Sequence, residues 1–346
     1  MIRDPFGFTR LYHDVAGRAA APTIRALFAA QPDLSRALDR EGVAAHLAGR
    51  FPPDRTCFAV VRALPPGHRL VATEHGLSAQ PYETVAKAGD LLTLLRAAVA
   101  KTLAEARGRV AVALSGGLDS ALVLALVHEL DPSVPAFVLD PRLDDDYGER
   151  EAALTTARQI GAEVVVFPAS AAEFRDALPA AIAAFETPIY NLHPLAKLLL
   201  ARAARAAGVT TIVSGDGADQ VFGRDDSANY LPLASAAFAS VEVALAAPFL
   251  EADVVACILA TPPDRDKQRL RQAAAQLPIP LPLVHGPKIS KLAPPIALDD
   301  FVSQARLREL ATMLALPPPL LRDDRERVRW TTLALLADAF DAHEAR

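Results

Sequence analysis

One stretch of six residues, from Ser115 to Ser120, combines the groups that can hold a phosphate. It reads Ser-Gly-Gly-Leu-Asp-Ser and separates the apolar run 110–114 from a second apolar run, 118–130. Two adjacent glycines let the backbone approach a ligand closely, and free N–H groups at a helix start face any anion there. The serines add hydroxyl groups, and Asp119 adds a carboxylate that can hold a cation between phosphates. The residue types predict an anion site, with a purely structural tight turn as the alternative.

A second polar segment, from Ser214 to Gly223, carries two carboxylates three residues apart, Asp216 and Asp219. It follows the apolar run 211–213 and therefore lies at the end of a predicted strand. Taken alone, it is typical of an Asp/Gly turn. Paired with the first segment, it predicts two acidic loops that face each other.

Alternating strands and helices are expected to position both segments. The apolar patterns predict strands at 110–114, 134–140, 164–167 and 211–213, and helices at 84–105, 118–130, 147–160, 171–185 and 194–207. This order predicts an α/β fold with a doubly wound parallel sheet and helices on both faces. Ligands of such sheets bind outside the carboxyl ends of the strands, where both segments would project.

The first 83 residues have a different character. Turn residues separate short apolar runs at 57–61 and 69–72, which predict hairpin strands, and residues 39–47 predict a helix. We therefore expect a small β-rich N-terminal segment, 1–83, followed by a larger domain, 84–346.

Composition excludes several classes of protein. The chain has 346 residues, 51% of them hydrophobic, which is enough for a substantial core. Its charges are interspersed and sum to −5, so we expect no nucleic-acid partner. Apolar runs long enough to span a membrane and a signal-peptide pattern are both absent, which predicts a cytoplasmic protein without a membrane partner. Cys57 and Cys257 lack cysteine or histidine neighbours and are interpreted as reduced thiols.

The two segments together resemble the synthetase domain of the asparagine synthetase family. That family has a pyrophosphate loop of the ATP pyrophosphatase type, Ser-Gly-Gly-Leu-Asp-Ser, and a later segment that reads Ser-Gly-Glu-Gly-Ala-Asp-Glu-Leu-Phe-Gly. Residues 248–251 are similar to its Pro-Phe-Leu-Asp motif, and 267–271 to its Lys-x-x-Leu-Arg motif. Residues 3–12 and 64–68 resemble the end of its glutaminase domain. The resemblance implies a fold of the adenine nucleotide α-hydrolase type, with 84–346 as the ATP-binding synthetase domain and 1–83 as a glutaminase remnant.

The resemblance also implies ATP and Mg²⁺ as cofactors and assigns roles to residues. The nucleotide would contact Leu114, Ser115, Gly116, Gly117, Leu118, Asp119, Ser120, Val138 and Gly215. Asp119 and Asp219 are expected to bind Mg²⁺. Lys288 is expected to stabilise charge during adenylation, with Lys291 as the alternative. Asp216 is expected to receive the proton of the amine or to orient the amine.

Several positions depart from the family pattern. Asp216, Gln220 and Glu251 stand where the family has Glu, Glu and Asp, so we expect a different substrate. In glutamine-using members an N-terminal cysteine generates ammonia, whereas this chain starts with Met1 near the end of the region that resembles that domain, so we expect no glutaminase activity.

A further group of residues in a proline-punctuated loop is expected to line an acyl pocket: Glu186, Tyr190 and His193, although a structural role is the alternative, above all for the histidine. The exposed strand edges predicted for the N-terminal segment suggest that a partner chain or a second copy covers it.

The implied reaction is ATP-dependent amide or lactam formation through an acyl-adenylate, with release of AMP and pyrophosphate. Its substrates would be a small-molecule or peptide carboxylate and an amine, as in β-lactam synthetases and lasso-peptide cyclases. Two alternatives stay open. One is ammonia-dependent amidation, like that of asparagine synthetase, fed by free ammonia or by a separate glutaminase. The other is a nucleotide-binding protein that has lost the chemistry.

Overall fold

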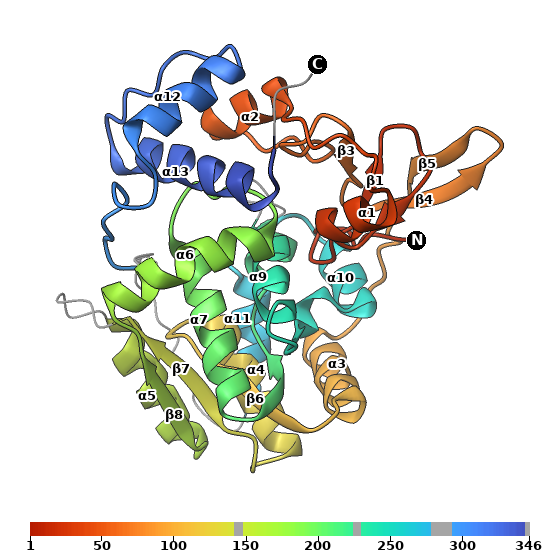
Figure 1. The fold of residues 1–346 in the computed structure, drawn as a ribbon. Helices are drawn as coiled ribbons and strands as arrows, with labels where there is room; N and C mark the ends of the chain where they lie inside the picture. The colour runs from red at the N-terminus through yellow and green to blue at the C-terminus, as the bar shows by residue number, and fades with distance from the viewer. Residues whose placement is uncertain (142–147, 224–229, 278–292, 343–346) are drawn as a thin grey trace.

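A five-stranded parallel sheet forms the centre of the larger part of the molecule (Figure 1). The computed structural model describes residues 1–141, 148–223, 230–277 and 293–342. The strand order is β10-β9-β6-β7-β8. The strands are β6 (Arg109–Ala113), β7 (Ala136–Asp140), β8 (Val164–Pro168), β9 (Val209–Val213) and β10 (Ala244–Ala246). All four neighbouring pairs run parallel, as the β/α alternation predicts.

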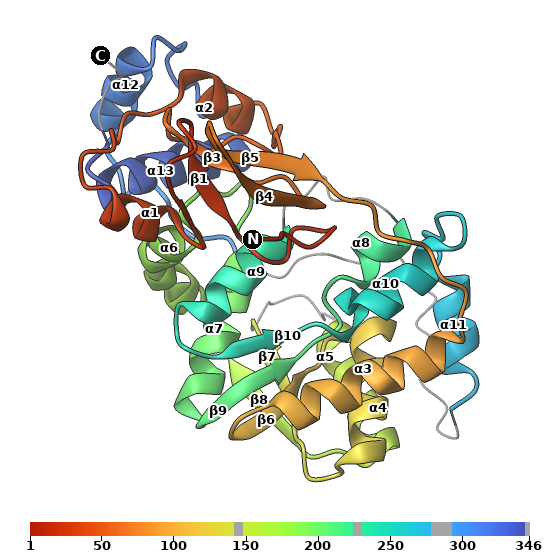
Figure 2. The same ribbon diagram turned by 90° about the vertical axis from the view of Figure 1, so that its right-hand side faces the viewer.

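Helices cover both faces of this sheet (Figure 2). Adjacent side chains of β6 enter different cores, since Ala111 packs with one cluster and Val112 with the other. The Val112 side holds α3 (Leu91–Glu105), α4 (Leu118–Leu130), α5 (Gly148–Ile160), the 3₁₀ turn η1 (Pro248–Leu250), α10 (Ala252–Leu259) and α11 (Gln268–Ala274). The Ala111 side holds α6 (Ala171–Phe185), α7 (His193–Ala206) and α9 (Tyr230–Ala239). The predicted doubly wound α/β fold is confirmed.

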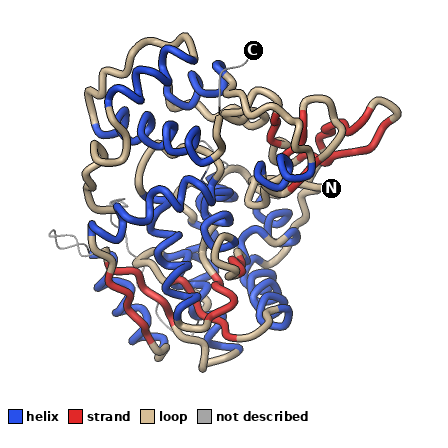
Figure 3. The backbone as a smooth tube through the Cα atoms, in the orientation of Figure 1, coloured by secondary structure: helices blue, strands red, loops and turns tan. Residues whose placement is uncertain are grey.

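The N-terminal segment packs against the C-terminal helices (Figures 1 and 3). It contains a three-stranded sheet of β1 (Tyr12–Asp14), β2 (Ala20–Ala21) and β3 (Val61–Ala63), the hairpin β4 (His68–Thr73) and β5 (Gly76–Pro81), and helices α1 (Ile24–Ala30) and α2 (Arg40–Leu47). The C-terminal helices are α12 (Gln304–Met313) and α13 (Asp324–Ala339). The ring of Phe58 lies 5.4 Å from that of Phe28 and 5.0 Å from that of Phe340. The two ends of the described chain therefore share one core.

Two predicted elements differ from the structure. The helix predicted from residue 84 begins only at Leu91, because Asp90 caps it by accepting a hydrogen bond from the Thr93 N–H. Val85 lies before this cap and is 79% exposed. The strand predicted at 57–61 is wrong apart from Val61, which opens β3. Among the described residues, we find no helix with the length and apolar character needed to cross a membrane.

Candidate functional site at the carboxyl ends of β6 and β9

The chain reverses its direction of travel across the sheet at β6. From this strand it first proceeds to β7 and β8 on one side, and it later returns to add β9 and β10 on the other. The adjacent strands β6 and β9 therefore flank a topological switch point, where open α/β sheets form a crevice for ligands. The segment 115–120 follows β6, and the segment 214–223 follows β9 and contains α8 (Ala218–Gly223). Both predicted loops thus lie at one crevice.

The first loop leaves the amino end of α4 open. Gly117 is the N-cap residue and makes no side-chain capping bond, so the first N–H groups of the helix have no such partner. Ser115 and Gly117 are exposed, whereas Ser120 is only 5% exposed. The Ser120 hydroxyl lies 2.9 Å from the Ser115 carbonyl and 3.1 Å from the Gly117 carbonyl. It braces the loop, and direct contact of this hydroxyl with a phosphate stays a prediction.

Gly215 joins the two loops. A Cβ atom built at this position would lie 2.8 Å from the backbone nitrogen of Ser120 and 2.9 Å from the Cβ of Asp119. Only a residue without a side chain fits this close approach of the second loop to the first. Gly215 therefore has a packing role that its sequence motif did not reveal, and its predicted nucleoside contact stays a prediction.

Asp119 and Asp219 meet at a single cation, the ammonium group of Lys267. The Nζ atom lies 2.6 Å from Asp119 Oδ2 and 2.5 Å from Asp219 Oδ1. Each aspartate occupies the first turn of its helix, α4 or α8. Lys267 is the N-cap residue of α11 and has a left-handed backbone with φ of 54°. The structure brings together the two predicted metal ligands, from loops that lie far apart in the sequence.

This donor set suits Mg²⁺. Two carboxylate oxygens already converge on one positive charge, and Mg²⁺ commonly takes one or two carboxylates together with substrate phosphates and water. Within the described ranges, no group of three or more His, Cys, Asp or Glu side chains is arranged to hold a metal. A Mg²⁺ ion held by Asp119 and Asp219 would accordingly depend on further oxygen ligands from a nucleotide or from water.

Asp216 is enclosed by donors. Lys197 Nζ, from α7, lies 2.9 Å from Oδ1 and 2.8 Å from Oδ2, and the Ser214 hydroxyl donates to Oδ2 at 2.9 Å. The Asp216 side chain is 13% exposed and that of Lys197 is 17% exposed. The predicted proton acceptor is therefore one half of a mostly buried ion pair.

Tyr230, the first residue of α9, completes this cluster, because Lys197 Nζ lies 5.9 Å from the centroid of its ring. Burial favours the neutral form of Lys197, but the nearby Asp216 carboxylate and Tyr230 outweigh it and raise the lysine pKa above its ordinary value. Burial also raises the pKa of Tyr230 to about 12, against the lowering effect of Lys197. At neutral pH the cluster holds an ammonium group and a protonated phenol.

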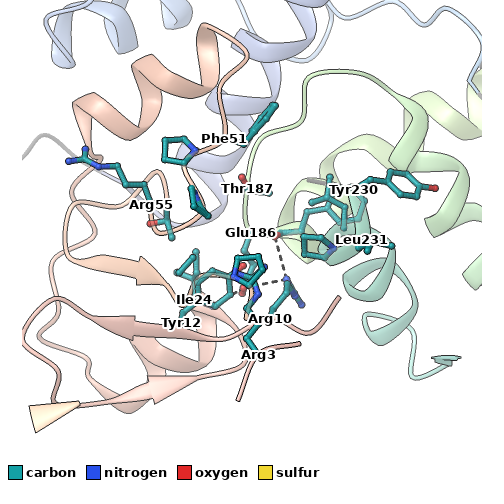
Figure 4. A pocket seen from close by; sticks show the side chains of 18 of the residues that line it. Arg3, Arg10, Tyr12, Ile24, Phe51, Arg55, Glu186, Thr187, Tyr230 and Leu231 are labelled. Atoms are coloured by element: carbon teal, nitrogen blue, oxygen red, sulfur yellow. Dashed lines mark hydrogen bonds and ion pairs between the residues drawn. The ribbon is translucent and has the colours of Figure 1, made fainter. Parts of the chain in front are cut away.

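Tyr230 also lines a cavity of about 220 Å³ between the N-terminal segment and the larger domain (Figure 4). Its walls include Arg10 and Phe51 from the N-terminal segment, and Glu186 and Gln220 from the larger domain. Because Gln220 follows Asp219 in the chain, the cavity extends from the region of Asp219 toward the N-terminal segment.

Glu186 links the larger domain to the N-terminal segment through hydrogen bonds. Its carboxylate accepts hydrogen bonds from the Ile24 and Arg25 N–H groups, at 2.7 and 2.9 Å, and so caps α1. Arg10 lies 3.7 Å away. Burial raises the Glu186 pKa, although these N–H groups and Arg10 favour the charged form. Of the three residues expected to line an acyl pocket, Glu186 borders the cavity and is committed to structural contacts.

The other two residues, Tyr190 and His193, are not among the described residues that line the cavity. The ring of Tyr190 packs 5.2 Å from that of Phe51, a cavity residue. His193 begins α7, and burial lowers its pKa.

Some predicted site residues are buried or outside the described ranges. Leu114, Leu118 and Val138 are 4%, 9% and 2% exposed, so their side chains present little surface to a nucleoside. Lys288 and Lys291 lie outside the described residues, and their roles stay predictions.

Sequence reasoning missed three residues of this site: Lys197, Tyr230 and Lys267. Lys267 belongs to a segment whose family resemblance was noted, 267–271, which could have drawn attention to it. Lys197 lies in an amphipathic helical pattern in which a lysine normally indicates a solvated face. Its pairing with Asp216 depends on the packing of α7 beside β9.

The chain is thus an α/β protein with a ligand site at its topological switch point. The amino end of α4 and the carboxylates of Asp119 and Asp219 lie together there. The family model described as asparagine synthase matches residues 90–241. The chain contains an asparagine synthase domain at these residues, as the two motifs led us to expect.

Two relatives show how much of the chain this similarity covers. The glutamine-hydrolyzing asparagine synthetase 1 of Bacillus subtilis is 27% identical over 236 residues, which is 64% of this chain and 36% of that protein. The amidase chyE of Penicillium rubens is 28% identical over 207 residues, 50% of this chain and 30% of that protein. The chain thus spans about a third of the length of these relatives.

A solved structure is also similar in part. The NH3-dependent NAD synthetase from Campylobacter jejuni matches 39% of this chain and 58% of its own, with 20% identity and a TM-score of 0.29. This similarity is too low to support an argument about the fold or the function.

Proposed function

We propose that this chain catalyses ATP-dependent amide bond formation through an acyl-adenylate. One observation carries the proposal: Asp119 and Asp219 converge on a single cation position, beside the open amino end of α4. An anion with several phosphates and its cation would satisfy both features at once. The asparagine synthase domain supports the same reaction class.

The first step would join a carboxylate substrate to AMP. The carboxylate oxygen attacks the α-phosphorus of ATP, the new P–O bond forms, and the bond to pyrophosphate breaks. Bound Mg²⁺ would neutralise charge on the phosphates. The N–H groups of Gly116, Gly117 and Leu118 would bind the leaving pyrophosphate, and Lys288 would stabilise charge at the reacting centre.

The second step would form the amide. The amine nitrogen attacks the acyl carbon, the C–N bond forms, and the C–O bond to AMP breaks, so that AMP leaves with the electron pair. The proton from the amine would pass to Asp216, the carboxylate paired with Lys197. Positioning of the two substrates supplies much of the rate increase in reactions of this kind.

A pyrophosphate-release assay with ATP, Mg²⁺ and a library of carboxylates tests the proposal. Release that depends on one amine-bearing acid or peptide supports intramolecular or peptide amide formation, whereas release with an amino acid plus ammonium supports the ammonia-dependent alternative. ATP binding without release across the library would refute a ligase and indicate a nucleotide-binding protein.

Two variants test the residue roles. We expect Asp119→Asn and Lys288→Ala each to abolish turnover without unfolding the chain. Asp131→Asn is the matched control for Asp119, because Asp131 is an exposed carboxylate at the opposite end of the same helix. Unchanged release by Lys288→Ala would contradict the role given to that lysine.

A further inference from the structure

Burial of the Lys197–Asp216 ion pair costs free energy, and several hydrogen bonds hold the pair in place. Removing two charges from water is favourable only if their geometry is good and further hydrogen bonds satisfy the remaining lone pairs. Here one ammonium group contacts both oxygens of one carboxylate, at 2.8 and 2.9 Å. The buried Ser214 hydroxyl adds a third contact, to Oδ2.

These contacts leave the Asp216 carboxylate one lone-pair site for a further hydrogen-bond donor. An ionised carboxylate offers about four lone-pair sites. Among the described residues, Lys197 uses one on each oxygen and Ser214 uses a second one on Oδ2, so the remaining site is on Oδ1. Asp216 can therefore accept one more proton donor, at a position that the other contacts fix.

Lys197 itself is unsuited to accept this proton, because the Asp216 carboxylate keeps its ammonium group charged. Tyr230 carries a proton of its own at neutral pH. Among these three groups, only the carboxylate has basic capacity left.

We propose that Lys197 is a positioning residue for the amide-forming step: it fixes the Asp216 carboxylate so that the free lone pair of Oδ1 faces the incoming amine. This inference rests on the proposed function and deepens it. It assigns to α7 a residue that acts through Asp216, and it predicts that the two half-reactions depend on Lys197 to different extents.

The test compares the half-reactions in Lys197→Met, which keeps an unbranched side chain one atom shorter and removes its charge. Carboxylate-dependent exchange of pyrophosphate into ATP reports adenylation, and amide formation reports both steps. The carboxylate and the amine are those that support pyrophosphate release by the unaltered chain. We expect exchange to stay within about threefold of the unaltered chain, while amide formation falls by about 100-fold, the scale of a lost proton acceptor.

Lys197→Arg should recover part of amide formation, because it restores a charged donor to the carboxylate. Arg205→Met is the matched control, since Arg205 lies on the same helix in an exposed ion pair with Glu242. It should change neither half-reaction.

The double variant Lys197→Met with Asp216→Asn separates positioning from folding. Removing both charges should restore thermal stability lost in the single variant, since no charge is then buried alone. Amide formation should stay low.

Three outcomes would overturn the inference: equal loss of both half-reactions in Lys197→Met, unchanged amide formation in that variant, or recovery of amide formation in the double variant. Absence of exchange in the unaltered chain with every carboxylate would instead refute the proposed function, and the inference with it.

Discussion

Gly215 lies so close to Asp119 that a Cβ atom on the glycine would be 2.8 Å from the aspartate carbonyl carbon. We predict that Gly215→Ala pushes the two loops apart and destabilises the fold by about 1–3 kcal/mol, the usual cost of overpacking. Nucleotide affinity should fall at least about tenfold, which corresponds to about 1.4 kcal/mol. Denaturant unfolding and titration calorimetry with ATP and Mg²⁺ measure the two effects. Gly223→Ala is the control, because its Cβ would meet no other described residue nearer than Arg265, at 3.9 Å.

Lys267 and Mg²⁺ compete for the same two carboxylates. Lys267→Met leaves Asp119 and Asp219 without this cation. We predict that Mg²⁺, in the absence of nucleotide, then raises the thermal stability of the variant more than that of the unaltered chain. At ten times the dissociation constant, Mg²⁺ would stabilise the fold by about 1.4 kcal/mol. Thermal unfolding across a Mg²⁺ series measures the effect. Lys101→Met, which removes a half-exposed partner of Glu251, should behave like the unaltered chain. The same Mg²⁺ response in both variants would argue against a shared site.

His46 is expected to make the fold sensitive to acid. Burial, with a smaller effect of Arg329, lowers its pKa from 6.5 to about 3. The unfolded chain therefore binds a proton that the folded chain does not, so the stability from neutral His46 is complete above pH 6.5 and is lost as the pH falls toward 3. Compared with His46→Leu, the unaltered chain should lose about 1.4 kcal/mol per pH unit in this window.

Denaturant unfolding at several pH values measures this difference. His75→Gln is the control, because the His75 side chain is 88% exposed. Parallel stability curves for the unaltered chain and His46→Leu would contradict the prediction.

Phe58 tests whether the two ends of the described chain unfold together. It is fully buried between Phe28 and Phe340, so Phe58→Ala should cost about 3–5 kcal/mol. Because the core is shared, we expect a single unfolding transition by both fluorescence and circular dichroism. Val85→Ala, at an exposed position, should change stability by less than about 0.5 kcal/mol. Two separate transitions would mean that residues 1–83 unfold on their own.

Local signals account for the elements that sequence reasoning predicted well. Helix α6 has the predicted bounds, 171–185, and its start is marked by a capping box in which Ser170 and Glu173 exchange hydrogen bonds. Helix α4 also has the predicted bounds, 118–130, because glycines precede it and its interior is continuously apolar. In both cases the boundary is set by residues next to it in the chain.

The parts that sequence reasoning missed depend on contacts between distant residues. Strand β10 has only three residues, Ala244, Leu245 and Ala246, and exists because it pairs with β9. The pattern of α7 marks Lys197 as polar but carries no information on whether that polar face meets water or Asp216. The approach of Asp119 and Asp219 was expected from strand order, whereas their bridging by Lys267 depends on a left-handed residue at the start of α11.

The placement of β6 between β7 and β9 has a consequence for assembly of the molecule. Strand β7 is the next strand along the chain after β6, but β9 joins only after two further β/α units have been made. Long-range pairings of this kind form late in folding, because a long loop must close first. We therefore expect one side of the crevice to form before the other, and recovery of nucleotide binding during refolding would time the insertion of β9 into the sheet.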